Sequence, residues 1–148
     1  MSLWEAALAW LRGRRGPEHL RRGRLGERAA RRHLERRGLK HLASNYRGRH
    51  GEIDLVLRDG DCLVFAEVKT RSVNARVRPA ASVDRRKRRR LSRTALEYLR
   101  RLPDPRVRIR FDVVEVLHEN GRVVEVRHLP CTFALTPPYR HEIGRAHV

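Results

Sequence analysis

The segment that most constrains the fold is a predicted hairpin at residues 51–71, GEIDLVLRDGDCLVFAEVKTR. Two apolar runs flank the Asp59-Gly60 pair, and glycine accepts the positive φ that a tight turn between antiparallel strands requires. In the second run, residues 63–69, apolar side chains alternate onto both faces of the strand. This pattern predicts a strand that is covered on both sides over most of its length.

Three charged residues of this hairpin need an explanation: Asp54 in the first strand, and Glu67 and Lys69 near the end of the second. Charged groups on a covered strand are costly unless they have partners. Mg²⁺ prefers oxygen ligands, keeps several waters and is bound through one or two carboxylates. The pattern therefore predicts an Mg²⁺ (or Mn²⁺) site held by Asp54, Glu67 and the carbonyl of Val68, with Lys69 beside the attacking water or the phosphate. The alternative is an ordinary Glu67–Lys69 ion pair at a sheet edge.

The charge of the chain indicates a polyanionic partner, because 35 Lys and Arg residues against 17 Asp and Glu residues leave a net charge of +18. Six consecutive basic residues stand where a predicted helix begins near Asp84, although cations at a helix N-terminus oppose the helix dipole and one another. Such a cluster is predicted to bind phosphates, and a solvated basic face is the alternative. The candidate nucleic-acid-binding residues are Arg85, Arg86, Lys87, Arg88, Arg89 and Arg90.

The chain is predicted to comprise an N-terminal segment at 1–22, one domain at 23–136 and a loosely held tail at 137–148. The N-terminal segment combines an amphipathic helix at 2–12 with a basic linker over 13–24. The domain is expected to contain helices over 27–37 and from 84 to before Pro103, and strands over 39–46, 110–117 and 122–129, with a short edge segment in 131–136.

The chemistry of the remaining residues indicates a cytoplasmic protein. No stretch approaches the length of a membrane span, so no membrane span is expected. The two cysteines, Cys62 and Cys131, show no motif spacing and are predicted to be reduced thiols.

The hairpin, together with GERAARRHLERRGLKHLASNYR before it and RFDVVEV after it, resembles the YraN-type family of bacterial proteins. That family is grouped with the restriction-endonuclease-like, Holliday-junction-resolvase-like nucleases. The resemblance covers roughly residues 23–135. It implies an α/β fold with an αβββαβ core, in which helices flank a mixed central sheet.

The resemblance also implies an active site. The pattern of a helix Glu, an Asp and a Glu-x-Lys triplet falls on Glu27, Asp54, Glu67 and Lys69, the four candidate catalytic residues. By composition alone, Glu27 is a surface residue that compensates the helix dipole. Lys87 corresponds to a basic position of the family and is a candidate phosphate contact. Two departures are Ile53, in place of the proline of the wider PD-(D/E)xK motif, and HLPCTFAL, in place of a short Asn-Ala-Phe ending.

These observations predict a metal-dependent endonuclease that hydrolyses phosphodiester bonds of DNA, including branched or structured DNA, with DNA favoured over RNA. Resolvase-like enzymes need two active sites to cut symmetrically, so a homodimer is expected from the resemblance. Two alternatives remain open. One is a nucleic-acid-binding protein that keeps the nuclease fold without cleaving, and the other is an RNA- or ribosome-associated basic protein.

Overall fold

The computed structural model describes residues 18–74 and 83–141, so the predicted helix at 2–12 and the end of the predicted tail lie outside the described residues. The predicted order of a helix, three strands, a helix and a strand is confirmed, and the further strand expected near the C-terminus follows it. The elements are α2 (Glu18–Arg36), β1 (Lys40–Arg47), β2 (Glu52–Asp59), β3 (Cys62–Ser72), α3 (Arg85–Arg100), β4 (Arg108–Glu119) and β5 (Arg122–Phe133).

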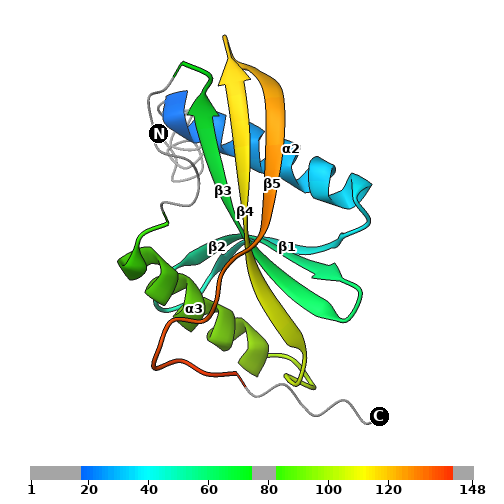
Figure 1. Ribbon diagram of the computed structural model, residues 1–148, viewed down its shortest axis with the longest axis vertical. Helices are drawn as coiled ribbons and strands as arrows, with labels where there is room; N and C mark the ends of the chain where they lie inside the picture. Colours follow the sequence, from blue (N-terminus) through cyan, green and yellow to red (C-terminus); the bar gives the residue numbers. More distant parts are fainter. Residues whose placement is uncertain (1–17, 75–82, 142–148) are drawn as a thin grey trace, which may run out of the picture.

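The five strands form one mixed sheet in the order β1-β2-β3-β4-β5. Neighbouring strands are antiparallel except β3 and β4, which are parallel. A parallel pair needs a crossover connection, and the segment between β3 and β4 contains α3. Figure 1 shows α2 along the upper strands and α3 below them, on the other side of the sheet.

Two hydrophobic clusters, one on each face, confirm that β3 is covered on both sides. Val64 and Ala66 pack into the cluster that contains Ala30 and Leu34 of α2. On the opposite face, residues of β3 pack against α3 together with residues of β2 and β4. The residues of this second cluster are Ile53, Val56, Leu63, Phe65, Val83, Leu91, Ala95, Leu99, Phe111 and Val113. The sheet is therefore the middle layer between two helices.

The first helix begins earlier than its predicted start at residue 27, because residues 18–24 are helical and not part of a linker. Glycine in a helix interior costs only about 1 kcal/mol relative to alanine, and the Arg and Leu residues around Gly23 form helices well. The predicted helix end is confirmed, since α2 ends at Arg36 and Gly38, two residues later, has a φ of +91°.

The predicted turns and the second helix are confirmed. Gly60 joins β2 to β3 with a φ of +58°, and Asn120 and Gly121 join β4 to β5 with φ of +50° and +76°. Helix α3 begins after Asp84, whose side chain accepts a hydrogen bond from the Lys87 amide at 2.8 Å.

Residues 135–141, which include the start of the predicted tail, make contacts with other parts of the described chain. The Tyr139 amide donates to the Thr136 carbonyl at 3.0 Å, and His141 Nε2 lies 2.6 Å from the Val107 carbonyl oxygen. The Thr136 amide also donates to Ser92 Oγ on α3 at 3.1 Å, and Leu135 packs against the core on that face. Thr136 is thus held against α3 and His141 against Val107, and neither composition nor periodicity indicates these contacts.

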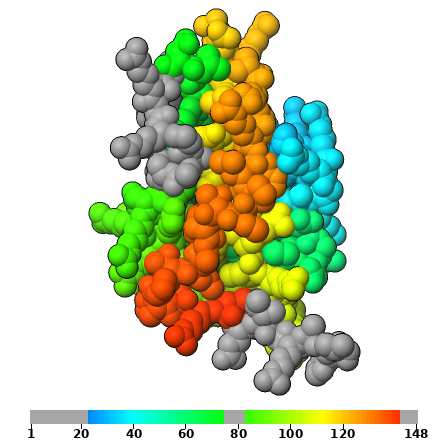
Figure 2. Space-filling view, viewed as in Figure 1, coloured from blue at the N-terminus to red at the C-terminus, as the bar shows by residue number. Residues whose placement is uncertain are grey.

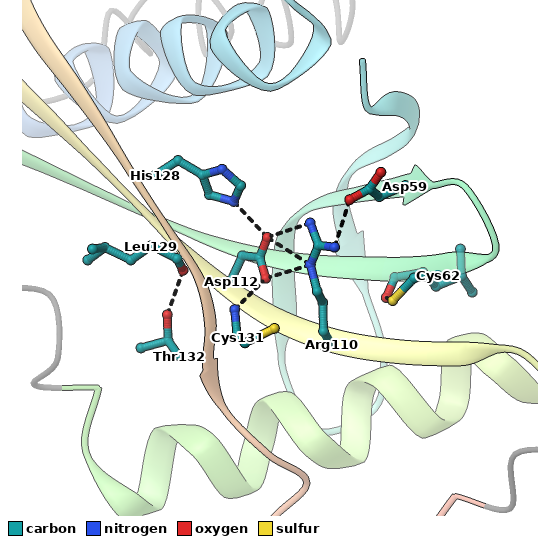
Figure 3. Close-up of polar contacts among 9 residues, drawn as sticks. Asp59, Cys62, Arg110, Asp112, His128, Leu129, Cys131 and Thr132 are labelled. Carbon is teal, nitrogen blue, oxygen red and sulfur yellow. Dashed lines mark hydrogen bonds and ion pairs between the residues drawn. The ribbon is translucent and has the colours of Figure 1, made fainter. Parts of the chain in front are cut away.

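A buried polar network fastens β5 and the β2–β3 turn to β4 (Figure 3). The fully buried Asp112 accepts hydrogen bonds from Arg110 at 3.1 Å, from the Cys131 amide at 3.0 Å, and lies 2.7 Å from His128 Nε2. Arg110 also donates to Asp59 at 2.7 Å. Although burial alone would raise the pKa of Asp112, the contacts with His128 and Arg110 hold that pKa below its ordinary value. The carboxylate is thus kept charged in the interior.

Candidate functional site

The candidate site forms where β2 and β3 separate. Their ladder ends at the pair Leu55–Ala66, so Asp54 and Glu67 are the next residues on the two strands. Asp54 Oδ2 accepts a hydrogen bond from the Val68 amide at 2.8 Å, in place of the backbone acceptor that a continued ladder would supply. The two predicted carboxylates therefore lie at a fork in the sheet.

Glu67 is buried, with 6% of its surface exposed, and it lies between two lysines. Lys69 Nζ is 3.7 Å from Glu67 Oε1, and Lys87 Nζ from α3 contacts the same oxygen. Lys87 was predicted as a phosphate contact, yet the structure places its ammonium group on Glu67. The buried carboxylate thus has the charged partners that its position requires.

The carboxyl groups of Asp54 and Glu67 interact strongly. Burial, and next the negative charge of Glu67, raise the pKa of Asp54 to about 8, although the Val68 amide hydrogen bond acts in the opposite direction. Ionising both groups is unfavourable unless a cation is near. Such a pair is the arrangement that binds a hard divalent cation.

Glu27 of α2 also belongs to this acidic group. Burial raises the pKa of Glu27, a hydrogen bond with Asn45 opposes the rise, and the charges of Glu52 and Glu67 add to it. Glu27 also contributes to the raised pKa of Asp54. The charges of Glu27, Asp54 and Glu67 therefore influence one another.

Asn45 is a site residue that the sequence analysis did not identify. It lies on β1 opposite Asp54, between the pairs Ser44–Leu55 and Tyr46–Ile53, and has a φ of +51°. Asparagine tolerates this left-handed conformation better than most residues do. The available signal was an asparagine, which strands disfavour, in the middle of a predicted strand. A surface hollow of about 400 Å³ opens there, lined by Arg24, Glu27, Arg28, Arg31, Ser44 and Asn45.

The pKa of Lys69 is lowered by burial and by the charge of Lys87, while Glu67 acts to raise it. A lysine with a lowered pKa releases its proton more readily than an exposed lysine. Because Lys69 lies beside Glu67, its ammonium group can neutralise a phosphate bound at the fork or exchange a proton there.

The residues present fit a magnesium ion. Asp54 and Glu67 supply two carboxylates, which suffice for an ion that keeps most of its waters. In a strand, the N–H and C=O of one residue point towards the same neighbour, so we expect the Val68 carbonyl on the edge that faces Asp54. Within residues 18–74 and 83–141, no group of three or more His, Cys, Asp or Glu side chains could hold an ion. A metal at this site would thus be bound by two side chains.

The basic run Arg85–Arg90 divides into two kinds of residue. Arg85, Arg86, Arg89 and Arg90 are exposed, and the first three line a hollow of about 420 Å³ with Thr136 and Pro137. Arg88 instead donates to the Val83 carbonyl at 2.7 Å and lies over the Phe133 ring at 5.4 Å. Four of the six predicted nucleic-acid-binding residues are therefore exposed on the surface.

Fold and site together define a class: an α/β protein with a five-stranded mixed sheet between two helices and a Glu, Asp, Glu-x-Lys group at a fork of that sheet. The family profile described as "Uncharacterised protein family UPF0102" matches residues 26–116, which include all four candidate catalytic residues. The chain belongs to this family, and this confirms the resemblance to the YraN-type proteins.

Relatives of this chain occur in several bacteria. A UPF0102 protein of Chlorobaculum tepidum is 40% identical over 116 residues, which are 75% of this chain and 90% of the relative. One of Parafrankia sp. is 47% identical over 108 residues, covering 73% of this chain and 92% of the relative. One of Halorhodospira halophila is 52% identical over 93 residues, which are 63% of this chain and 74% of the relative. In the part of the chain that the structure describes, no helix is long and apolar enough to cross a bilayer.

Proposed function

We propose that this protein is a metal-dependent endonuclease that hydrolyses phosphodiester bonds of DNA, with Asp54 and Glu67 as the metal ligands. The observation that carries the proposal is the placement of these two carboxyl groups at the fork between β2 and β3. Their mutual repulsion is expressed in the pKa of Asp54, which burial and Glu67 raise to about 8. Branched or structured DNA is included among the proposed substrates.

The surrounding residues supply the other requirements of phosphodiester hydrolysis. When bound, Mg²⁺ would activate a water molecule and offset the negative charge of the phosphate. Lys69 places a second positive charge beside Glu67, at 3.7 Å from Oε1. Glu27, held by Asn45, borders the acidic pair from α2. The exposed arginines of α3 contribute phosphate contacts that are independent of sequence.

A second candidate function is nucleic-acid binding without cleavage, and one observation favours it. Lys87 Nζ contacts Glu67, so a cation of the protein already occupies part of the position that a metal would need. A metal that used both carboxylates would have to displace this ammonium group. The two functions therefore differ in whether divalent ions bind at the fork.

Cleavage of linear, flap and junction DNA, and of RNA of matched sequence, tests the proposal in the presence of Mg²⁺ or Mn²⁺. We expect Asp54→Asn and Glu67→Gln to lower the cleavage rate at least about 100-fold and to leave DNA binding intact, since each removes a charged ligand. The matched control is Glu35→Gln, because Glu35 is an exposed carboxylate of α2 that is paired with Arg31 at 3.0 Å. Cleavage that persists in both site variants would place the activity elsewhere.

Metal binding is measured separately by Mn²⁺ titration in electron paramagnetic resonance. The nuclease proposal predicts Mn²⁺ binding that Asp54→Asn abolishes and that Lys87→Ala strengthens, because the competing ammonium group is removed. A wild-type protein that binds DNA but neither binds Mn²⁺ nor cuts would support the binding-only function.

A further inference from the structure

Helix α2 carries a row of exposed arginines at four-residue spacing. The row consists of Arg24, Arg28, Arg32 and Arg36. Residues four apart lie on nearly the same side of a helix and about 6 Å apart along its axis, so the row extends over about 18 Å. All four positions of the row are arginine, and none is occupied by Asp or Glu.

Three of these arginines line a groove between α2 and the β4–β5 hairpin. The groove has a volume of about 530 Å³ and is lined by Leu25, Arg28, Ala29, Arg32, His33, Arg36, Gly121, Arg122, Val123 and Val126. Figures 1 and 2 show α2 lying alongside β5. Four arginines therefore surround this groove: Arg28, Arg32, Arg36 and Arg122.

The charge of the groove is not neutralised within the described chain. Glu35 is paired with Arg31 at 3.0 Å, and Glu125 is paired with Arg127 at 2.8 Å. None of the ion pairs among residues 18–74 and 83–141 involves the four arginines of the groove. Like charges held close together repel, and an external polyanion removes that repulsion.

We infer that this groove is a second nucleic-acid-binding surface that takes the phosphate backbone of duplex DNA. The three α2 arginines of the groove span about 12 Å, which corresponds to between three and four base pairs at about 3.4 Å each. The groove lies on the α2 side of the sheet, whereas the exposed arginines of Arg85–Arg90 lie on the α3 side. One chain thus binds two separate duplex segments. The inference rests on the proposed nucleic-acid partner and is independent of cleavage.

The test compares two variants with equal charge. The groove variant replaces Arg28, Arg32, Arg36 and Arg122 by glutamine, and the control replaces Arg58, Arg100, Arg106 and Arg108, which are exposed elsewhere. Each variant removes four positive charges, so the net charge falls from +18 to +14 in both, that is, 18 − 4. Circular dichroism and thermal unfolding verify that both variants are folded.

Binding of a fluorescent duplex of about ten base pairs, long enough for the arginine row, is measured without divalent ions. We expect wild type and control to bind two duplexes per chain, and the groove variant to bind one. For the binding of all duplexes together, the slope of log K against log salt should become less negative by about 3–4 in the groove variant, because each lost phosphate contact contributes about 0.9. Substituting Arg85, Arg86, Arg89 and Arg90 by glutamine should instead abolish binding of the duplex on the α3 side.

Three results would overturn the inference. The first is that the groove variant binds as many duplexes as the control variant and with the same salt slope. This result would overturn the inference even if the wild-type protein cuts DNA. The second is that the groove variant binds DNA as the wild type does but no longer binds phosphatidylserine vesicles. This result would make the groove a site for lipid headgroups. The third is a wild-type chain that binds no duplex, and this alone would also remove the proposed nuclease function.

Discussion

At Asp54, burial and the neighbouring Glu67 act in the same direction and raise the pKa to about 8. Glu67 itself lies against Lys69 and Lys87, which supply positive charge on its α3 side. One carboxyl group of the pair is therefore balanced by lysines, whereas burial and the charge of Glu67 favour the protonated form of the other, Asp54. Any cation that binds at the fork has to displace a proton, an ammonium group or both.

The raised pKa of Asp54 makes the stability of the metal-free protein dependent on pH. The unfolded chain releases this proton near the ordinary value of 3.8, whereas the folded chain keeps it until about 8. The free energy of unfolding therefore falls as pH rises from 4 to 8. We expect Asp54→Asn, measured by urea unfolding in EDTA, to lose this fall and to be more stable than wild type at pH 8 by roughly 2–4 kcal/mol.

The control for this measurement is Glu35→Gln, which changes an exposed carboxylate that is paired with Arg31. Its stability curve should run parallel to that of wild type between pH 4 and pH 8. If the Asp54→Asn curve were also parallel to the wild-type curve, Asp54 would not be a protonated partner of Glu67, and the cation-site interpretation would lose its main support.

Among the elements, α2 positions Glu27 through a close contact with β3. A Cβ atom on Gly26 would lie 1.9 Å from Thr70 Oγ1 and 3.1 Å from Thr70 Cβ, so only glycine permits this approach. The next residue of α2 is Glu27, which faces Asn45 and the acidic pair. The depth at which α2 packs on the sheet therefore sets the position of a candidate catalytic residue.

Substitution of Gly26 by alanine is expected to push α2 away from β3. Overpacking of this kind typically costs about 1–3 kcal/mol, and we expect that loss in the free energy of unfolding of Gly26→Ala by urea titration. Displacement of Glu27 should also lower cleavage. Thr70→Ala in the same chain should restore part of the stability, because it removes the hydroxyl that the new methyl group meets.

A second glycine of the same helix provides the matched control. A Cβ atom on Gly23 would meet nothing within 4 Å, so Gly23→Ala should stabilise the protein by about 0.5–1 kcal/mol through helix propensity alone. Equal effects of the two substitutions would show that helix propensity, and not the contact with Thr70, determines the behaviour of Gly26.

Over the whole molecule, charges of opposite sign occupy different places. The carboxyl groups of Asp54 and Glu67 lie at the fork in the sheet, where the charge of Glu27 acts on Asp54, while exposed arginines lie along α2 on one face and on α3 on the other. A polyanion drawn to either helix is held close to the acidic residues that a metal would neutralise. The net charge of +18 is therefore distributed unevenly, with two basic surfaces and an acidic centre between them.

Binding to DNA should be strongly dependent on salt and weakly dependent on sequence, because arginine–phosphate contacts carry no base information. With about four phosphate contacts on each surface, the affinity of either surface for a duplex should fall about 100-fold between about 50 and 200 mM salt. Fluorescence anisotropy with duplexes of unrelated sequence measures both properties. A preference above about tenfold for one sequence would contradict backbone recognition and indicate base contacts.

The sequence alone determined the elements and the candidate residues. Alternating apolar side chains in residues 63–69 indicated a strand covered on both faces, and Asp59-Gly60 and Asn120-Gly121 indicated the two hairpins. These signals are local, because strand alternation and turn geometry depend on neighbours in the chain. The predicted start of α2 was wrong for the same reason, because the prediction used only neighbours in the chain. Gly23 and Gly26 disfavour a helix locally, and only the structure shows that Gly26 packs against Thr70.

Only the tertiary structure decided how the charges are partnered. Residues 20 or more positions apart in the chain meet where Lys87 contacts Glu67, where Arg88 lies over Phe133 and where α2 and Arg122 border one groove. Local pattern carries no information about such pairs, since the partner of a buried or crowded charge is whichever element packs next to it. The sequence names the groups that can act, and packing sets their charge and their distances.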